Sequence, residues 1–200
     1  FGMELIFVSR ESYRDKKGLF EQYFGNYPEA FFIDEGGASI EATRGCSELL
    51  DELDQAYDHL FCACGTGTTV AGLIQGIDKH QLETTVHALP VFKNGNLIKD
   101  EVLKYTPLSP RFAMHLDYHF GGYAKTKPEL IQFIRSFTAQ TGILLDPVYT
   151  GKLFYAIHDL IQQNYFKPHS NILAIHTGGL FGLLGMRDKF SSQNIPINKT

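Results

Sequence analysis

Hydrophobic and polar positions alternate along the chain in the pattern typical of βαβ units. Apolar runs of strand length are separated by segments of helical period. Several of these runs are almost continuously apolar, as in strands that are covered on both faces. The pattern predicts six strands, over Leu5–Val8, Ala30–Ile33, His59–Cys64, Thr85–Leu89, Phe112–Leu116 and Ile172–His176.

The segments of helical period predict five helices, over Ser47–Ala56, Thr69–Ile77, Pro128–Thr141, Lys152–Gln163 and Gly179–Gly185. Pro128 suits a first helical turn, because its missing N–H would be unpaired there anyway. Strands that alternate with helices indicate an α/β fold of three layers, with a mostly parallel sheet and helices on both faces. Ligands of such folds bind beyond the carboxyl ends of the strands, so candidate chemistry is sought in those turns.

Charge and composition narrow the function classes. The net charge of −4 provides no basic surface for a phosphate backbone, so nucleic acid is not an expected partner. No apolar run approaches the ~20 residues of a membrane span. The three cysteines are few and odd in number, so they do not form a disulfide framework, and this favours a reducing compartment. We therefore expect a soluble, cytoplasmic protein with no membrane association.

Metal binding is not expected either. Cys62 and Cys64 lie two apart on a predicted strand, so they share a face and are interpreted as small buried hydrophobic residues rather than redox or metal-binding groups. His115 and His119 lack the intervening glutamate of a zinc-binding HExxH helix.

The strongest local signal is the turn Gly65-Thr66-Gly67-Thr68-Thr69, which joins a buried strand to a helix. Glycines let backbone N–H groups approach a ligand, threonine hydroxyls add donors, and a helix N-terminus adds partial positive charge, so together they predict a phosphate cradle. The alternative is a tight turn with threonine caps and no ligand. A Walker loop would need a lysine here, and a dinucleotide site would need glycine at Val70. A compact monophosphate, such as that of pyridoxal 5'-phosphate, fits better.

Two further turns carry similar chemistry. Residues 146–152 read Asp-Pro-Val-Tyr-Thr-Gly-Lys, and residues 176–179 read His-Thr-Gly-Gly after a predicted strand. Tyr149 offers a phenol that handles protons or donates a hydrogen bond. Thr150 either caps the following helix or directs its hydroxyl into a site. Strand ends with the same chemistry are expected to converge on one crevice.

These three segments, in this order, resemble the family of 1-aminocyclopropane-1-carboxylate deaminase and D-cysteine desulfhydrase, which are pyridoxal-phosphate enzymes of the tryptophan synthase β-subunit fold (fold type II). The resemblance extends from Val8 to Gly182. It implies that Gly65, Thr66, Gly67, Thr68 and Thr69 hold the cofactor phosphate, and that Thr150 and Thr177 lie near the pyridine nitrogen. It also implies that Tyr149 faces the substrate. Gly121-Gly122-Tyr123 resembles the loop with a second active-site tyrosine, although Tyr123 as a packed aromatic residue is the alternative.

The resemblance also suggests a substrate. Deaminases of the cyclopropane type carry glutamate at the position of Thr150 and leucine at that of Thr177, whereas two threonines are the desulfhydrase-like pattern. A neutral hydroxyl near the ring nitrogen leaves the cofactor a milder electron sink, which suffices where thiolate is the leaving group. We therefore expect a lyase that performs β-elimination on a D-amino acid, D-cysteine first. The alternatives are a 1-aminocyclopropane-1-carboxylate deaminase, another β-eliminating relative with a substrate such as cysteate, a non-catalytic cofactor-binding paralogue, and a phosphosugar- or nucleotide-binding domain.

One departure from the family concerns its catalytic lysine. The family's lysine that holds the cofactor aldehyde, and a Ser-Asn-His segment near it, lie in an N-terminal region that we expect to precede Phe1. Lys152 is no substitute and is interpreted as a helix-surface or structural residue. The 200 residues are therefore expected to be inactive without that region.

The resemblance also implies a domain division and a homodimer. We expect residues 1–28 to be the remnant of a smaller domain with its connection, residues 29–190 to be the large cofactor-binding domain, and residues 191–200 to be a polar tail.

Overall fold

The computed structural model describes residues 2–107 and 109–190. Its strands are β1 (His59–Cys64), β2 (Thr85–Pro90), β3 (Phe112–Met114) and β4 (Ile172–Ala174). Its α-helices are α1 (Lys16–Phe24), α2 (Ile40–Ser47), α3 (Thr68–Lys79), α4 (Leu97–Leu103), α5 (Pro128–Thr141), α6 (Thr150–Gln162) and α7 (Phe181–Gly185). Short 3-10 turns lie at Ser12–Arg14, Glu35–Gly37, Glu48–Leu50, Asp117–His119 and Arg187–Phe190.

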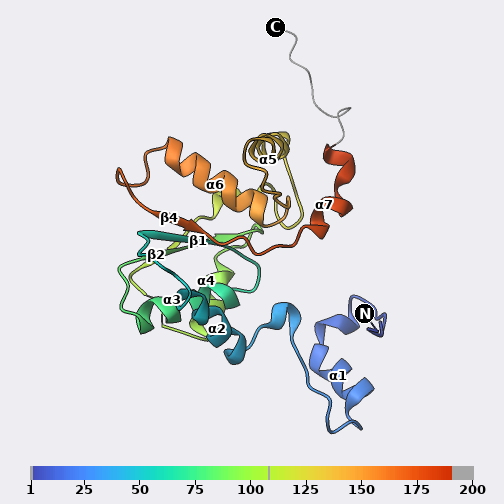
Figure 1. Cartoon of the computed structure of the whole chain (residues 1–200). Helices are drawn as coiled ribbons and strands as arrows, with labels where there is room; N and C mark the ends of the chain where they lie inside the picture. Colours follow the sequence, from blue (N-terminus) through green and yellow to red (C-terminus); the bar gives the residue numbers. More distant parts are fainter. Residues whose placement is uncertain (1, 108, 191–200) are drawn as a thin grey trace.

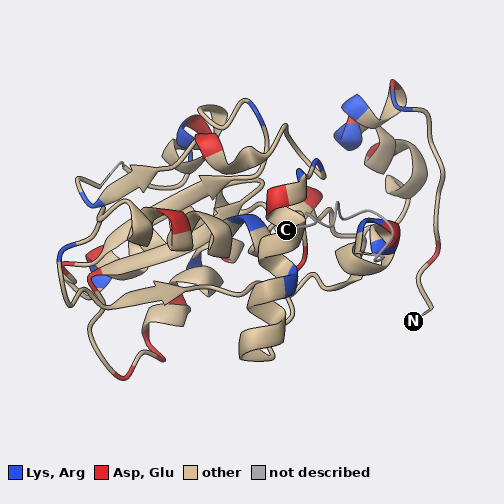
Figure 2. Ribbon diagram, turned by 90° about the horizontal axis from the view of Figure 1, so that it is seen from above, with Lys and Arg blue, Asp and Glu red and all other residues tan. Residues whose placement is uncertain are grey.

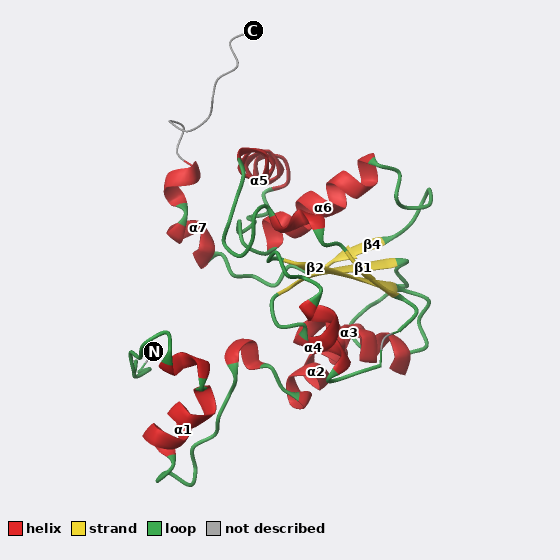
Figure 3. Cartoon of the chain, turned by 180° about the vertical axis from the view of Figure 1, so that it is seen from behind, coloured by secondary structure: helices red, strands yellow, loops and turns green. Residues whose placement is uncertain are grey.

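The four strands form one parallel sheet in the order β3-β2-β1-β4. Helices α2, α3 and α4 cover one face, and α5 and α6 lie over the other (Figure 1). The view from behind shows the same three layers (Figure 3). The predicted α/β fold, with a mostly parallel sheet between helices, is therefore confirmed.

The alternation of side chains along β1 supplies the core on both faces of the sheet. Leu60, Cys62 and Cys64 pack with α3 and α4 on one side. Phe61 and Ala63 pack with α6 on the other. Both cysteines are buried, as predicted, and burial raises the pKa of the Cys62 thiol to about 12. A third cluster, between α5 and α6, includes Leu130 and Leu145.

Helix α2 lies directly against α3 because α3 has a glycine where the two helices meet. A Cβ at Gly72 would collide with the Thr43 carbonyl of α2. The Ser39 hydroxyl starts α2 by accepting a hydrogen bond of 3.1 Å from the backbone N–H of Ala42. The sequence prediction placed a helix at Ser47–Ala56 instead, and this was wrong, because the cap at Ser39 sets the start of the helix earlier in the chain.

Residues 2–39 lie to one side of the sheet body, where α1 is the main helix (Figures 1 and 3). The predicted strands Leu5–Val8 and Ala30–Ile33 are wrong, since neither segment pairs with another strand. Strands need a neighbour for their backbone N–H and C=O groups, and an apolar run alone does not provide one. Residues 30–34 pack instead on α1, with Phe32 against Phe20 at 5.4 Å between ring centroids and Asp34 paired with Lys16 at 2.8 Å.

Other differences are smaller. Pro128–Thr141 is helical as predicted, and the helices at Thr69–Ile77, Lys152–Gln163 and Gly179–Gly185 are confirmed with shifts of one or two residues at their ends. The strands at Phe112 and Ile172 are each two residues shorter than predicted. Helices α1 and α4 were not predicted. The predicted tail, residues 191–200, lies outside the described residues.

Basic and acidic residues are interspersed over the ribbon (Figure 2). Within the described part of the chain, no helix is long and apolar enough to cross a membrane.

Candidate active site

The glycine-threonine turn forms the start of α3. Gly67, at the N-cap, has a φ of +82°, a left-handed conformation that favours glycine, and no side chain caps the helix. The Thr66 and Thr68 hydroxyls lie 3.0 Å apart. The first N–H groups of an α-helix have no partner within the helix, and its dipole places partial positive charge at this end. The turn is therefore suited to an anion.

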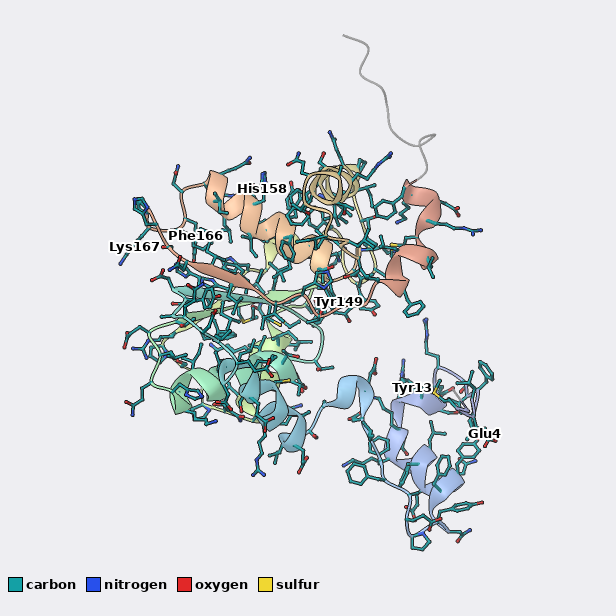
Figure 4. The ribbon with its side chains drawn as sticks, in the orientation of Figure 1. Glu4, Tyr13, Tyr149, His158, Phe166 and Lys167 are labelled. Atoms are coloured by element: carbon teal, nitrogen blue, oxygen red, sulfur yellow. The ribbon has the colours of Figure 1, made fainter. Side chains whose placement is uncertain are left out.

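The second motif meets this turn through its tyrosine. A Cβ at Gly65 would lie 3.2 Å from the Tyr149 hydroxyl, so the phenol stands directly over the first residue of the turn. Figure 4 shows Tyr149 at the beginning of α6. The segment before it is not a strand, in contrast to the expectation that all three motifs follow strand ends.

Asp146 organises the beginning of α6. Its carboxylate accepts hydrogen bonds of 2.7–2.8 Å from the backbone N–H groups of Val148, Tyr149 and Thr150. The Thr150 hydroxyl donates to the same carboxylate at 2.7 Å and accepts from the Asp146 N–H at 2.8 Å. Thr150 is fully buried, and its hydroxyl faces Asp146. The Thr150 hydroxyl thus stabilises the beginning of the helix through Asp146, and its place near a cofactor stays a prediction.

The third motif lies beside the second. The His176 Nε2 is 2.8 Å from the carbonyl oxygen of Leu144, and a Cβ at Gly182 would lie 3.6 Å from Asp146. Thr177, next to His176, is exposed. The first and second motifs are therefore in contact, and the second and third are joined through the neighbouring residues Leu144 and Gly182. A single crevice shared by all three stays a prediction.

Tyr123 completes the arrangement from a different loop. Its ring meets that of Tyr149 edge-on, with 6.1 Å between centroids and 76° between planes, and 58% of Tyr123 is exposed. Burial raises the pKa of Tyr149 above its usual value, and the Tyr123 phenol is the second cause. Tyr149 therefore keeps its proton at neutral pH.

Comparison with known proteins identifies the family of this chain. The family model described as "Pyridoxal-phosphate dependent enzyme" matches residues 1–178. The chain belongs to this family.

Within the pyridoxal-phosphate-dependent family, the similar proteins are those of the deaminase and desulfhydrase group. A protein of Pyrococcus horikoshii named "Putative 1-aminocyclopropane-1-carboxylate deaminase" is 34% identical over 81% of this chain and 53% of its own length. The Arabidopsis thaliana "Bifunctional D-cysteine desulfhydrase/1-aminocyclopropane-1-carboxylate deaminase, mitochondrial" is 29% identical over 96% of this chain and 53% of its own. A crystal structure of an "ACC deaminase homologue" superposes with a TM-score of 0.77 at 27% identity, over 94% of this chain and 62% of that one. The chain thus spans about half the length of the curated relatives it matches.

Two residues beside the glycine-threonine turn and Tyr149 were not predicted from the sequence. A Cβ at Gly36 would lie 3.0 Å from the Thr66 side chain, and the charge of Glu35 contributes to the raised pKa of Tyr149. The turn that follows residues 30–34 therefore contacts the glycine-threonine turn. Its Glu-Gly-Gly sequence before a serine cap resembles the other motifs in composition, and that signal could have identified it.

Lys152 is not on the surface of its helix. It is fully buried, so the surface interpretation is wrong and the structural one is confirmed. Its ammonium donates to the carbonyl oxygens of Val91 at 3.1 Å, His119 at 2.9 Å and Gly122 at 2.9 Å. Burial lowers the pKa of Lys152 to about 8, while the charge of Asp146 acts in the opposite direction.

Proposed function

We propose that the parent protein is a lyase that performs β-elimination on a D-amino acid, with pyridoxal phosphate held by this chain. D-Cysteine is the first choice of substrate, with pyruvate, ammonia and sulfide as products. The observation that supports this best is the position of the Tyr149 phenol over Gly65, at the turn that begins α3.

The glycine-threonine turn fits a phosphate monoester. Backbone N–H groups at the uncapped beginning of α3 and the paired hydroxyls of Thr66 and Thr68 provide donors for its oxygens. We propose that residues 65–69 hold the phosphate together. A side chain at Gly65 would occupy the space next to the Tyr149 hydroxyl, so glycine keeps that space open.

The phenols of Tyr149 and Tyr123 are proposed to act on the substrate beside the glycine-threonine turn. When bound, pyridoxal phosphate supplies an electron sink for the electrons released at the α-carbon of an amino acid. Tyr149 remains protonated at neutral pH, because burial and Tyr123 raise its pKa, so it donates a hydrogen bond or a proton to a substrate atom. Tyr123 is exposed next to it and is proposed to contact the substrate.

The choice of D-cysteine over the cyclopropane substrate depends on Thr150 and Thr177, which we propose to lie near the ring nitrogen. A threonine hydroxyl is neutral, so Thr150 places no charge of its own at the site, unlike the glutamate of the cyclopropane deaminases. Replacing Thr150 by Glu together with Thr177 by Leu should move activity from D-cysteine towards 1-aminocyclopropane-1-carboxylate. If the double variant keeps the preference of the wild type, the substrate assignment is wrong.

The assay of the function is an absorbance spectrum of the protein from the full open reading frame, before and after D-cysteine is added. We expect a visible cofactor band that changes with D-cysteine while sulfide is released. A colourless protein that makes no sulfide would instead identify a non-catalytic paralogue. In the same protein we propose a homodimer, which its mass in solution would test.

The cradle can be tested separately in the 200-residue chain. Calorimetric titration with pyridoxal phosphate should show weaker binding for Thr68→Val than for the wild type. Thr84→Val is the matched control, since Thr84 is equally buried but donates to the Tyr57 carbonyl, away from the site. Equal loss of binding in both variants would contradict the assignment of the turn.

A further inference from the structure

Lys152 connects the beginning of α6 to the loop that carries Tyr123. A lysine ammonium has three donors, and here each has one carbonyl oxygen within 3.1 Å. One carbonyl belongs to Val91, directly after β2. The other two belong to His119 and Gly122, at either end of one short turn. The ammonium therefore fastens this turn to both α6 and the sheet.

The turn that Lys152 holds has an unusual backbone. Phe120, Gly121 and Gly122 have φ values of +53°, +99° and +126°, so three consecutive residues lie in a region that most side chains avoid. Glycine adopts positive φ readily, but Phe120 does so only where its surroundings impose it. The Gly122 carbonyl, which faces the ammonium, belongs to the residue directly before Tyr123.

Tyr149 and Lys152 contact the two parts of this loop from the same helical turn. They are three residues apart at the beginning of α6, a spacing that places two side chains on the same side of a helix. Tyr149 meets the ring of Tyr123, and Lys152 holds the residue before it. The position of one phenol relative to the other is therefore linked to a single buried cation.

We propose that Lys152 is a positioning residue, whose ammonium holds the 119–122 turn so that Tyr123 stands against Tyr149. The catalytic consequence rests on the proposed function, in which both phenols face the substrate. The positioning itself rests only on contacts within this chain, so it is tested without cofactor or substrate.

The test is fluorine NMR of the 200-residue chain labelled with 3-fluorotyrosine, with resonances assigned by Tyr→Phe variants. Tyr123→Phe should move the Tyr149 resonance and lower the pKa of Tyr149, because Tyr123 is one cause of its raised value. Lys152→Met should move the Tyr149 resonance in the same way, and the double variant should show no further movement. The resonance of Tyr105, which packs against the core on the other face of the sheet, should stay in place throughout. His158→Gln, an exposed site on the same helix, is the matched control and should change neither property.

Several outcomes overturn the proposal. If Lys152→Met folds and Tyr149 keeps the resonance of the wild type, Lys152 does not position Tyr123. If Lys152→Met does not fold, Lys152→Gln, which keeps two N–H donors, replaces it. If neither variant folds, Lys152 stabilises the whole chain and a specific positioning role is refuted.

Activity separates this proposal from the proposed function. In the protein from the full open reading frame, Tyr123→Phe and Lys152→Met should each reduce kcat by about 10²-fold, without adding to one another. An unchanged kcat in Tyr123→Phe, combined with the expected NMR changes, would refute the catalytic use of Tyr123 and leave the positioning intact.

Discussion

Three histidines form a hydrogen-bonded row across the sheet, and this row should make the stability of the fold depend on pH. His59 Nδ1 lies 3.0 Å from His87 Nε2, and His87 Nδ1 lies 2.9 Å from His115 Nε2. His87 is the central and buried member, and its ring stacks on Phe61 with 4.2 Å between centroids. Burial, followed by the charges that His115 and His59 would carry, lowers the pKa of His87 from 6.5 to about 3.

The direction of the pH effect follows from which state binds the proton. Below pH 6.5 the unfolded chain protonates this imidazole, while the folded chain does not until about pH 3. The contribution of neutral His87 to the free energy of unfolding is therefore fully present above pH 6.5 and is lost as the pH falls towards 3. Each pH unit below 6.5 in this window lowers the free energy of unfolding by about 1.4 kcal/mol. At about pH 5, His87 has therefore lowered it by roughly 2 kcal/mol.

The measurement is urea unfolding followed by circular dichroism at about pH 7.5 and about pH 5, in the wild type and in His87→Asn. The variant should be less stable at the higher pH, because it loses the imidazole stack, but its stability should fall by about 2 kcal/mol less on acidification. Carboxylates with lowered pKa, such as that of Asp34, weaken both proteins equally and cancel in the comparison. The exposed His158 provides the control His158→Asn, which should keep the slope of the wild type. A His87→Asn variant with that same slope would refute the reasoning.

Three other perturbations have defined outcomes. Asp146→Ala removes the acceptor of four hydrogen bonds, three of them buried, and should lower the free energy of unfolding by about 2–3 kcal/mol in urea titrations. Gly67→Ala and Gly142→Ala both place a side chain at positive φ and should each cost about 1–2 kcal/mol, but only the first should weaken pyridoxal-phosphate binding measured by calorimetry. Cys62 and Cys64 are buried, so a thiol reagent should modify only the remaining cysteine in the folded chain and all three in denaturant.

The sheet body could be predicted from the sequence because its signals are local. Continuous apolar runs gave β1 and β2 to within a residue, and Pro128 marked the first residue of α5. The N-terminal residues could not be predicted in this way. Their apolar runs have the composition of strands, but whether a run becomes a strand depends on a neighbour that the local sequence does not specify. Phe7 and Phe31 remain 89% and 82% exposed in segments that pair with no strand.

The candidate site also has a part that local sequence predicts and a part that it does not. Recognisable turn sequences mark four of the candidate site residues, which are Gly65, Gly67, Tyr149 and Thr177. Their roles as cofactor or substrate contacts remain predictions. The part played by Lys152 could not be read from the sequence, because its partners lie 30 to 61 residues away and are backbone carbonyls. A backbone acceptor has no residue type, so the sequence around it carries no signal.

At the beginning of α6, residues whose roles were predicted from the sequence and residues whose roles were not depend on the same contacts. Asp146 fixes the first backbone N–H groups of the helix, which determines where Tyr149 and Lys152 point. Tyr149 then reaches Gly65 in one direction and Tyr123 in another, while Lys152 secures the loop from which Tyr123 comes. Because Tyr149 and Lys152 lie within about one helical turn, a displacement of that turn would move the phenol relative to the glycine-threonine turn and to the second phenol together. Residues 146–152 are all buried except the half-buried Tyr149, so contacts constrain this segment along its whole length. The turn at residues 65–69 is less distinctive, because a glycine-rich turn before a helix N-terminus occurs in many unrelated folds.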